Sequence, residues 1–245
     1  MARRRRRVGR GPSPRTGDVP GATARRPGRG APVRPDLRCY LVTSGTDRAT
    51  VETAAAAARA GAGIVQVRAK DATTAQLLEL VVAIADAVRA AAPSARVVVN
   101  DRADVAFAAR SLGAAVHGVH LGQDDLPVPQ ARALLGPDAL IGLTTGTLDL
   151  VVSAQRWAPM VDYLGAGPFR PTPTKDSGRA PLGVAGYRVL TAASALPVVA
   201  IGGITPPDVE ALAGTGVAGV AVVRAIMDSG DPGQVVRGVL RAFAR

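Results

Sequence analysis

From residue 38 onward, short runs of β-branched and other apolar residues alternate with alanine-rich segments whose apolar positions recur with helical spacing. The apolar runs predict eight strands, at residues 39–43, 63–68, 96–100, 118–121, 139–144, 162–165, 197–201 and 219–223. The intervening segments predict helices at residues 49–60, 74–91, 104–112, 129–135, 148–158, 184–195, 208–213 and 232–243. Runs that are apolar throughout are typical of strands buried on both faces of a parallel sheet.

Eight strand–helix pairs in about 200 residues predict a protein of the α/β class that forms a single (β/α)8 TIM barrel. We expect this catalytic domain at residues 36–245, because 245 residues with 47% hydrophobic content can bury one sizeable core. A doubly wound open sheet is the structural alternative. No G-x-G-x-x-G sequence follows the first predicted strand, which disfavours the dinucleotide-binding form of that sheet.

The formal net charge of +11 belongs almost entirely to the N-terminal segment. Residues 1–38 contain 12 arginines and two acidic residues, a net charge of +10, whereas the other 207 residues contain 18 basic and 17 acidic side chains. Residues 1–35 are rich in Arg, Pro and Gly and predict a disordered basic tail. Its arginine run from Arg3 to Arg7 can contact phosphates non-specifically, so a nucleic-acid or anion-binding protein acting through the tail is an alternative function.

Targeting signals are missing from this pattern, so we expect a cytoplasmic protein. No apolar stretch follows the N-terminal charges, as a secretory signal requires. No apolar run approaches the roughly 18 residues of a membrane span. A single cysteine, Cys39, excludes an intramolecular disulfide framework and is expected in the core.

Lysine is rare in this chain, which makes its two lysines informative. Of the 30 basic side chains, 28 are arginine, and the exceptions Lys70 and Lys175 each follow a predicted strand. An ammonium group is compact and strongly hydrated, unlike the planar guanidinium fork. The pattern therefore predicts two ammonium groups that face one anionic substrate.

Polar residues gather at the carboxyl ends of the predicted strands, where barrel enzymes carry their chemistry. In the second strand Gln66, Arg68 and Lys70 are spaced by two, so they project on one side of the extended chain. The other strand ends contribute Asn100, Asp101, Asp124, Asp125, Thr144, Thr172, Pro173, Thr174, Lys175, Gly202, Gly203, Val223 and Arg224. By contrast, we expect His117 and His120 to be structural.

Together these residues predict a phosphate site with a metal. The glycine pair after the seventh strand allows backbone N–H groups to approach an anion closely. Asp101 and one carboxylate of the Asp124–Asp125 pair can share Mg²⁺, which prefers hard oxygen ligands. Arg68, Lys70 and Lys175 supply more positive charge than a monophosphate needs, which indicates a second ligand such as a diphosphate.

The motifs QVRAKD, VNDRAD, GVHLGQDD, GPFRPTPTK and VAIGGI closely resemble those of the thiamine-phosphate synthase family, in the same order from about Leu37 to about Pro232. The resemblance implies a transferase of thiamine biosynthesis. It would join 4-amino-2-methyl-5-hydroxymethylpyrimidine diphosphate to 4-methyl-5-(2-phosphoethyl)thiazole by a dissociative, Mg-assisted substitution that gives thiamine phosphate and pyrophosphate. Its partners would be these small-molecule substrates, with no specific nucleic acid and no membrane, and a homo-oligomer is compatible with it.

The resemblance also implies a role for each matching residue. The pyrimidine diphosphate contacts would be Gln66, Arg68, Lys70, Asn100, Thr144 and Lys175, of which Arg68, Lys70 and Lys175 would be catalytic. The thiazole phosphate contacts would be Thr172, Pro173, Thr174, Gly203, Val223 and Arg224. One Mg²⁺ per subunit would bind Asp101 and Asp125.

Three features depart from the family pattern. Thr144 and Arg224 stand where serine is usual, and about five extra residues lie around residues 110–117. We expect the surplus at the face of the barrel opposite the site; a shift of the fourth strand would invalidate the Asp125 assignment. The nearest alternative function, a thiazole tautomerase of the same barrel family, would need neither the Gln66, Arg68 and Lys70 set nor a two-carboxylate metal site.

Deletion of residues 1–35 tests the alternative function of the tail. We expect unchanged turnover of the truncated protein in a thiamine phosphate synthesis assay, because the predicted site residues all lie in the barrel. A large loss of turnover by truncated protein with an unchanged circular dichroism spectrum would contradict this expectation.

Overall fold

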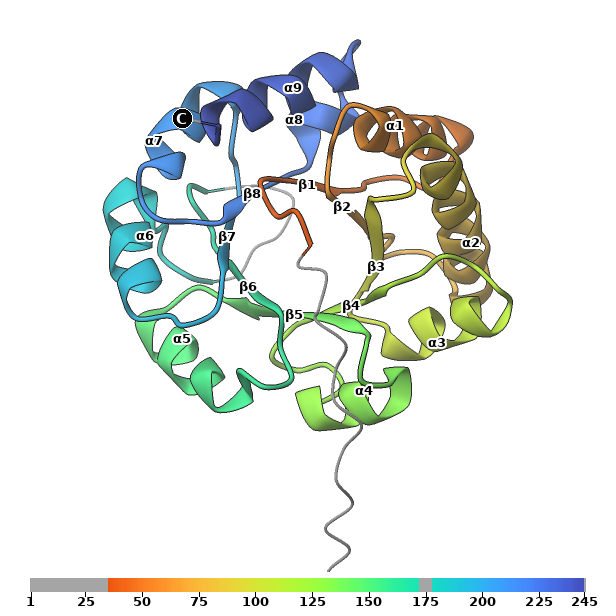
Figure 1. The fold of residues 1–245 in the computed structure, drawn as a ribbon, viewed down its shortest axis with the longest axis horizontal. Coiled ribbons are helices and arrows are strands. Elements are labelled where there is room, and N and C mark those ends of the chain that lie inside the picture. The colour runs from red at the N-terminus through yellow and green to blue at the C-terminus, as the bar shows by residue number, and fades with distance from the viewer. Residues whose placement is uncertain (1–34, 172–177, 245) are drawn as a thin grey trace, which may run out of the picture. The chain divides into compact units, whose positions relative to one another are not determined.

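The computed structural model describes residues 35–171 and 178–244. Within them eight parallel strands close into a barrel in sequence order, which confirms the predicted (β/α)8 fold and excludes the open sheet. The strands are β1 (Cys39–Val42), β2 (Ile64–Val67), β3 (Arg96–Asn100), β4 (Gly118–Leu121), β5 (Leu140–Thr145), β6 (Tyr163–Ala166), β7 (Val198–Ile201) and β8 (Gly219–Val222). Figure 1 looks down the barrel and shows the helices as an outer ring.

The helices follow the predicted segments closely, with one short addition, and two of the predicted segments overlap a 3₁₀ turn at one end. The α-helices are α1 (Arg48–Arg59), α2 (Thr74–Ala91), α3 (Ala103–Ser111), α4 (Val128–Leu135), α5 (Leu148–Ala154), α6 (Gly183–Ala192), α7 (Val209–Ala213), α8 (Arg224–Met227) and α9 (Pro232–Ala242). The 3₁₀ turns are η1 (Gln155–Trp157) and η2 (Pro206–Asp208). Helix α8 was not predicted, because a single turn is too short to show helical periodicity.

Alternating residues of each strand divide between two apolar clusters. In β1, Cys39 and Leu41 pack in the large cluster between the strands and the outer helices. Tyr40 and Val42 pack in the smaller cluster that fills the barrel interior. All four side chains are buried, as a period of two on a sheet with both faces covered requires. The expectation that Cys39 belongs to the core is confirmed.

Two interior glycines make room for large side chains inside the barrel. A Cβ atom on Gly142 of β5 would lie 2.2 Å from Cζ of Tyr163 and 2.4 Å from Nδ1 of His120. A Cβ atom on Gly165 of β6 would lie 2.8 Å from Cε1 of His120. The absence of side chains at these positions therefore allows His120 and Tyr163 to stack, with ring centroids 5.5 Å apart.

The surplus around residues 110–117 does not displace the fourth strand. It spans the end of α3 and the connection to β4, at the amino ends of the strands. Strand β4 pairs with β3 so that Gly118 lies opposite Val98 and His120 opposite Asn100. The segment after β4, which carries Asp125, therefore begins at the same barrel end as Asp101.

His117 belongs to the amino-terminal end of the barrel. Its Nδ1 accepts a hydrogen bond of 3.0 Å from the backbone N–H of Val97, and Nη1 of Arg96 lies 3.0 Å from its Nε2. Burial, together with the charge of Arg96, lowers the pKa of His117 to about 4. The prediction of a structural role is consistent with these contacts.

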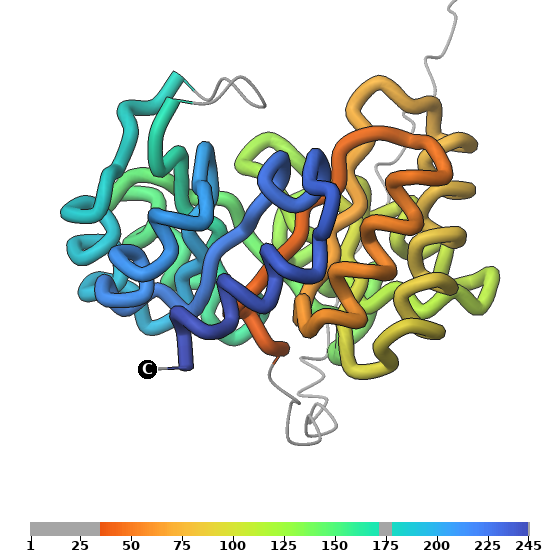
Figure 2. The backbone as a smooth tube through the Cα atoms, turned by 90° about the horizontal axis from the view of Figure 1, so that it is seen from above, coloured from red at the N-terminus to blue at the C-terminus, as the bar shows by residue number. Residues whose placement is uncertain are grey.

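Figure 2 shows the barrel from the side, with the beginning of the described chain and its last helix near the lower edge. Strand β1 leads upward from there, so the carboxyl ends of the strands lie at the upper edge. No helix in residues 35–171 and 178–244 has the length and apolar character needed to cross a membrane. The predicted tail falls outside the described residues except for Pro35.

The shifted pKa of His117 predicts acid-sensitive stability. The unfolded chain takes up a proton near pH 6.5 and the folded protein only near pH 4, so stability present above pH 6.5 is lost as the pH falls towards 4. Because the imidazole is partly exposed, we expect this loss to be roughly 1–2 kcal/mol, less than the full shift implies.

Urea unfolding at pH 7 and pH 4 measures this loss. His117→Asn keeps an acceptor for the Val97 N–H but cannot be protonated, so its stability should fall less between the two pH values. An equal fall in the wild type and the variant would show that His117 does not contribute.

Candidate active site

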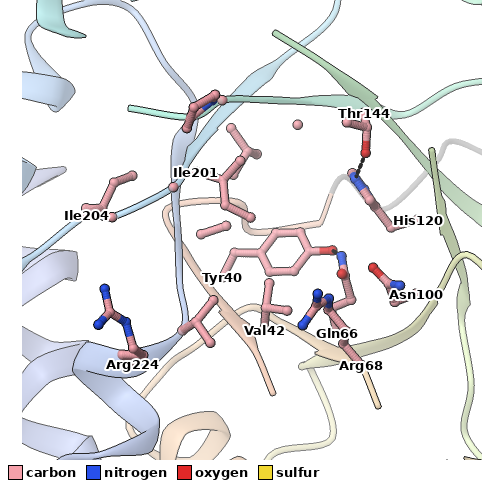
Figure 3. Close-up of a pocket in the computed structure, with 18 of the residues that line it drawn as sticks. Tyr40, Val42, Gln66, Arg68, Asn100, His120, Thr144, Ile201, Ile204 and Arg224 are labelled. Atoms are coloured by element: carbon pink, nitrogen blue, oxygen red, sulfur yellow. Dashed lines mark hydrogen bonds between the residues drawn. The ribbon is translucent and has the colours of Figure 1, made fainter. Parts of the chain in front are cut away.

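A cavity of about 410 Å³ opens at the carboxyl ends of the barrel strands. It is lined by many of the residues that the sequence singled out: Gln66, Arg68, Lys70, Asn100, Asp101, Thr144, Gly203, Val223 and Arg224. Figure 3 shows how the labelled ones converge from separate strands around the Tyr40 ring. The barrel closure thus brings together positions that are more than 150 residues apart in the chain.

Strand β2 and the residues after it supply one wall of the cavity. Gln66 is buried, Arg68 is half-buried and Lys70 is exposed, so their depth decreases along the strand direction. The backbone N–H of Arg68 donates to Oγ1 of Thr43 at 3.1 Å, which fixes the chain where it leaves the strand. Burial lowers the pKa of the Arg68 guanidinium, whereas the negative charge of Asp101 opposes that shift.

The rim of the cavity is strongly positive. Among its lining residues the cations are Arg68, Lys70, Arg179 and Arg224, and the one carboxylate is Asp101. A concave surface with this imbalance attracts anionic ligands, because low-dielectric walls concentrate the field of the charges. The cavity is therefore suited to phosphate-bearing ligands.

Asp101 and Asp125 follow neighbouring strands. Asp101 has a φ of 62°, a conformation that non-glycine residues seldom adopt, and its N–H donates to the His120 carbonyl oxygen at 2.8 Å. Asp125 is partly buried, and its Oδ2 accepts from the Gly122 N–H at 2.5 Å; it does not line the cavity.

The two carboxylates are of the chemical kind that Mg²⁺ commonly binds. No group of three or more His, Cys, Asp or Glu side chains in the described parts of the chain could hold a metal. Mg²⁺ commonly binds one or two carboxylates and completes its shell with substrate phosphates and water. The donor set is hard oxygen, as Mg²⁺ requires.

The glycine pair after β7 forms a turn that only glycine adopts readily. Gly202 and Gly203 have φ values of 104° and 71°, and both line the cavity. A Cβ atom on Gly203 would lie 2.5 Å from Cγ of Arg170. Arg170 in turn pairs with Asp208 at 2.5 Å, and the backbone N–H of Arg170 donates to the Gly202 carbonyl oxygen at 3.1 Å.

The residues after β8, which lead into the short helix α8, also line the cavity. Val223 precedes α8 with backbone angles of −110° and −90°, and Arg224 is the first residue of the helix. Both line the cavity, with Arg224 exposed. In Figure 3, Arg224 at the start of α8 and Ile204 in the segment after β7 lie on the same side of the cavity.

Four of the predicted residues cannot be placed in the cavity. Thr172, Pro173, Thr174 and Lys175 lie outside the described residues. The described chain on one side of them, at Gly167 and Pro168, lines the cavity, and so does Arg179 on the other. Arg179 donates from Nη1 to the Thr145 carbonyl oxygen at 3.1 Å.

A chain of hydrogen bonds crosses the floor of the cavity. Nε2 of Gln66 donates to Oη of Tyr40 at 2.6 Å, and Oη of Tyr40 lies 2.8 Å from Oη of Tyr163. Oη of Tyr163 lies 3.2 Å from Nδ1 of His120, whose Nε2 lies 3.0 Å from Oγ1 of Thr144. Burial raises the pKa of both phenols well above the ordinary value, so both keep their protons at neutral pH.

Sequence reasoning missed Tyr40, Tyr163 and Arg179 as lining residues. Two of the chain's three tyrosines occupy alternate, inward positions of predicted strands, which was an available signal. His120 has partners on both ring nitrogens, as expected of a structural histidine, and it also lines the cavity. Nothing in the sequence distinguishes Arg179 from the many other arginines.

Comparison with known proteins agrees with this geometry. A family described as thiamine monophosphate synthase matches residues 39–226. A thiamine-phosphate synthase of Corynebacterium efficiens is 56% identical over 210 residues, which cover 85% of this chain and 96% of that protein. A thiamine-phosphate synthase of Corynebacterium jeikeium is 54% identical over 209 residues, with 85% and 95% coverage.

A solved structure is also similar to this chain in both fold and sequence. The thiamine phosphate pyrophosphorylase from Pyrococcus furiosus superposes with a TM-score of 0.74 at 30% sequence identity. The alignment covers 86% of this chain and 97% of that one. The similarity therefore extends over the whole barrel.

Proposed function

The chain belongs to the thiamine monophosphate synthase family, and we propose that the cavity at its barrel mouth is the site where thiamine phosphate forms. The enzyme joins the pyrimidine diphosphate to the thiazole phosphate and releases pyrophosphate. The observation that carries this proposal is the cationic rim around a cavity of about 410 Å³, a volume suited to two small ligands. The related proteins from both Corynebacterium species are synthases, which favours this reaction over the tautomerase alternative.

The pyrimidine diphosphate binds along β2 and the adjoining strand ends. Gln66, Asn100 and Thr144 supply polar groups for the aminopyrimidine ring, and all three line the cavity. Arg68 and Lys70 lie closer to the rim and bind the diphosphate. Lys175, which lies outside the described residues, completes this set through its matching motif.

Asp101 and Asp125 would hold one Mg²⁺ at the diphosphate. When bound, the ion supplies Lewis-acid neutralisation of the phosphate oxygens. The left-handed backbone of Asp101 supports this assignment, because such conformations cluster at functional sites.

The thiazole phosphate binds on the opposite side, between the turn after β7 and the start of α8. The N–H of Gly203, whose φ is 71°, and the backbone at Val223 and Arg224 form the phosphate cradle. Barrels of this class often bind phosphate between strands seven and eight. The Arg224 guanidinium adds a positive charge at this position, and Thr172, Pro173 and Thr174 complete the contacts.

The chemistry needs charge stabilisation and no general base. The C–O bond of the pyrimidine methylene breaks, and its electron pair leaves with pyrophosphate. The lone pair of the thiazole nitrogen then forms the C–N bond, and no proton is transferred. Arg68, Lys70 and Lys175 stabilise the charge that grows on the leaving group, an electrostatic contribution that is often the largest in catalysis.

A magnesium-dependent assay tests the proposed function. Purified protein with both substrates and Mg²⁺ should produce thiamine phosphate, detected after oxidation as fluorescent thiochrome, and EDTA should abolish the product. Excess Mg²⁺ added after EDTA should restore it. Absence of product from folded protein would refute the proposed reaction.

Asp101→Asn tests the metal site separately from the fold. Asparagine tolerates the left-handed conformation but lacks the negative charge, so the Mg²⁺ concentration for half-maximal turnover should rise at least about tenfold. The free energy of unfolding should change by no more than about 0.5 kcal/mol.

The matched control is Asp104→Asn, which removes a nearby carboxylate in an exposed ion pair with Arg102. This control should keep the wild-type Mg²⁺ dependence, because exposed pairs contribute little. An equal Mg²⁺ dependence of the Asp101 variant and the wild type would remove Asp101 from the metal site.

A further inference from the structure

The hydrogen-bond chain from Gln66 to Thr144 has a direction that its buried hydroxyl groups determine. Oη of Tyr40 accepts from Nε2 of Gln66 at 2.6 Å, and Tyr40 is 1% exposed. Among the described residues, the hydrogen-bond partners of this hydroxyl are Gln66 and Tyr163. The Tyr40 proton therefore points to Oη of Tyr163, since a buried donor without an acceptor is unfavourable.

The next two bonds follow from the first. Oη of Tyr163 accepts a hydrogen bond from the Tyr40 hydroxyl, so the Tyr163 hydroxyl donates its own hydrogen bond to Nδ1 of His120, 3.2 Å away. A neutral imidazole carries one proton, and Nε2 must then hold it and donate to Oγ1 of Thr144 at 3.0 Å. The reverse direction would leave the Tyr40 proton without an acceptor in the described part of the chain.

We infer that His120 is a positioning residue that holds the Thr144 hydroxyl as a hydrogen-bond donor to an acceptor atom of the substrate's pyrimidine ring. This inference rests on the proposed function. Oγ1 of Thr144 accepts from His120, so the hydroxyl proton is directed elsewhere, and Thr144 lines the cavity. A nitrogen of the pyrimidine ring is the kind of acceptor that such a donor recognises.

The packing around His120 fixes its ring in the required orientation. Its ring stacks on Tyr163 with an interplanar angle of 26°, and the absent side chains of Gly142 and Gly165 leave the space that both rings occupy. Tyr163 also packs against Tyr40 in a T-shaped arrangement, with ring centroids 5.7 Å apart. His120 therefore reaches Thr144 from a rigid support rather than from a mobile loop.

The floor of the cavity consists of amide, hydroxyl and imidazole groups that hydrogen-bond to one another. Positive charge is instead concentrated at the rim, where pyrophosphate leaves.

Two substitutions of His120 test the hydrogen-bonding roles of its two ring nitrogens separately. His120→Gln can still donate to Thr144 from a nitrogen near the Nε2 position, whereas His120→Asn can accept from Tyr163 but does not reach Thr144. We expect kcat/KM for the pyrimidine diphosphate to fall about tenfold in the Asn variant and by no more than about threefold in the Gln variant. The KM for the thiazole phosphate should stay unchanged in both.

A double-mutant cycle with Thr144→Val shows whether His120 acts through Thr144. Valine keeps the shape of threonine but has no hydroxyl group, so His120→Asn should cause no further loss in this background. Equal losses in the Asn and Gln variants, or losses that add to that of Thr144→Val, would overturn the inference.

The histidine tautomer is a readout that does not depend on activity. The chain has two histidines, so ¹⁵N-histidine labelling gives two sets of ring resonances, and His117→Asn identifies those of His120. We expect Nε2 of His120 to carry the proton in the wild type, and this preference to weaken in Tyr163→Phe. A proton on Nδ1 in the wild type would overturn the inference, whereas absence of thiamine phosphate synthesis with the expected tautomer would refute the proposed function instead.

Discussion

Closure of eight parallel strands into one barrel is the constraint on which the site depends. Every strand runs in the same direction, so all eight carboxyl ends meet around one opening. Residues from Gln66 on β2 to Arg224 after β8 line the same cavity because of this closure. Closure also buries one face of each strand inside the barrel, where each polar side chain needs a partner.

The barrel interior contains both apolar and polar side chains. The apolar ones include Leu37, Ile64, Val98 and Leu140. Nearer the opening, the floor of the cavity consists of polar groups that satisfy one another through Tyr40, Tyr163 and His120. A fully connected polar chain is rigid, because breaking one bond leaves two buried groups without partners.

Much of the fold, and many of the residues that line the cavity, could be predicted from the sequence. Strand β3 matched its predicted residues, and Gln66, Arg68 and Lys70 line the cavity as their spacing of two indicated. The floor was harder to predict, because the contact between Tyr40 and Tyr163 joins β1 to β6 across the barrel. Such a contact depends on strand register and on the space at Gly142, neither of which a local pattern contains.

The cavity has a charged rim and a floor of hydroxyl and amide groups. This division matches the charge changes expected when the thiazole nitrogen replaces pyrophosphate at the pyrimidine methylene. Negative charge moves outward with the pyrophosphate, towards Arg68 and Lys70, which lie near solvent and can release the product. Positive charge develops on the pyrimidine, above phenols that keep their protons. Fixed dipoles stabilise such a separation without reorganising during the reaction. The arrangement therefore favours bond cleavage by electrostatic stabilisation of the separating charges, and the proposed chemistry requires no general base.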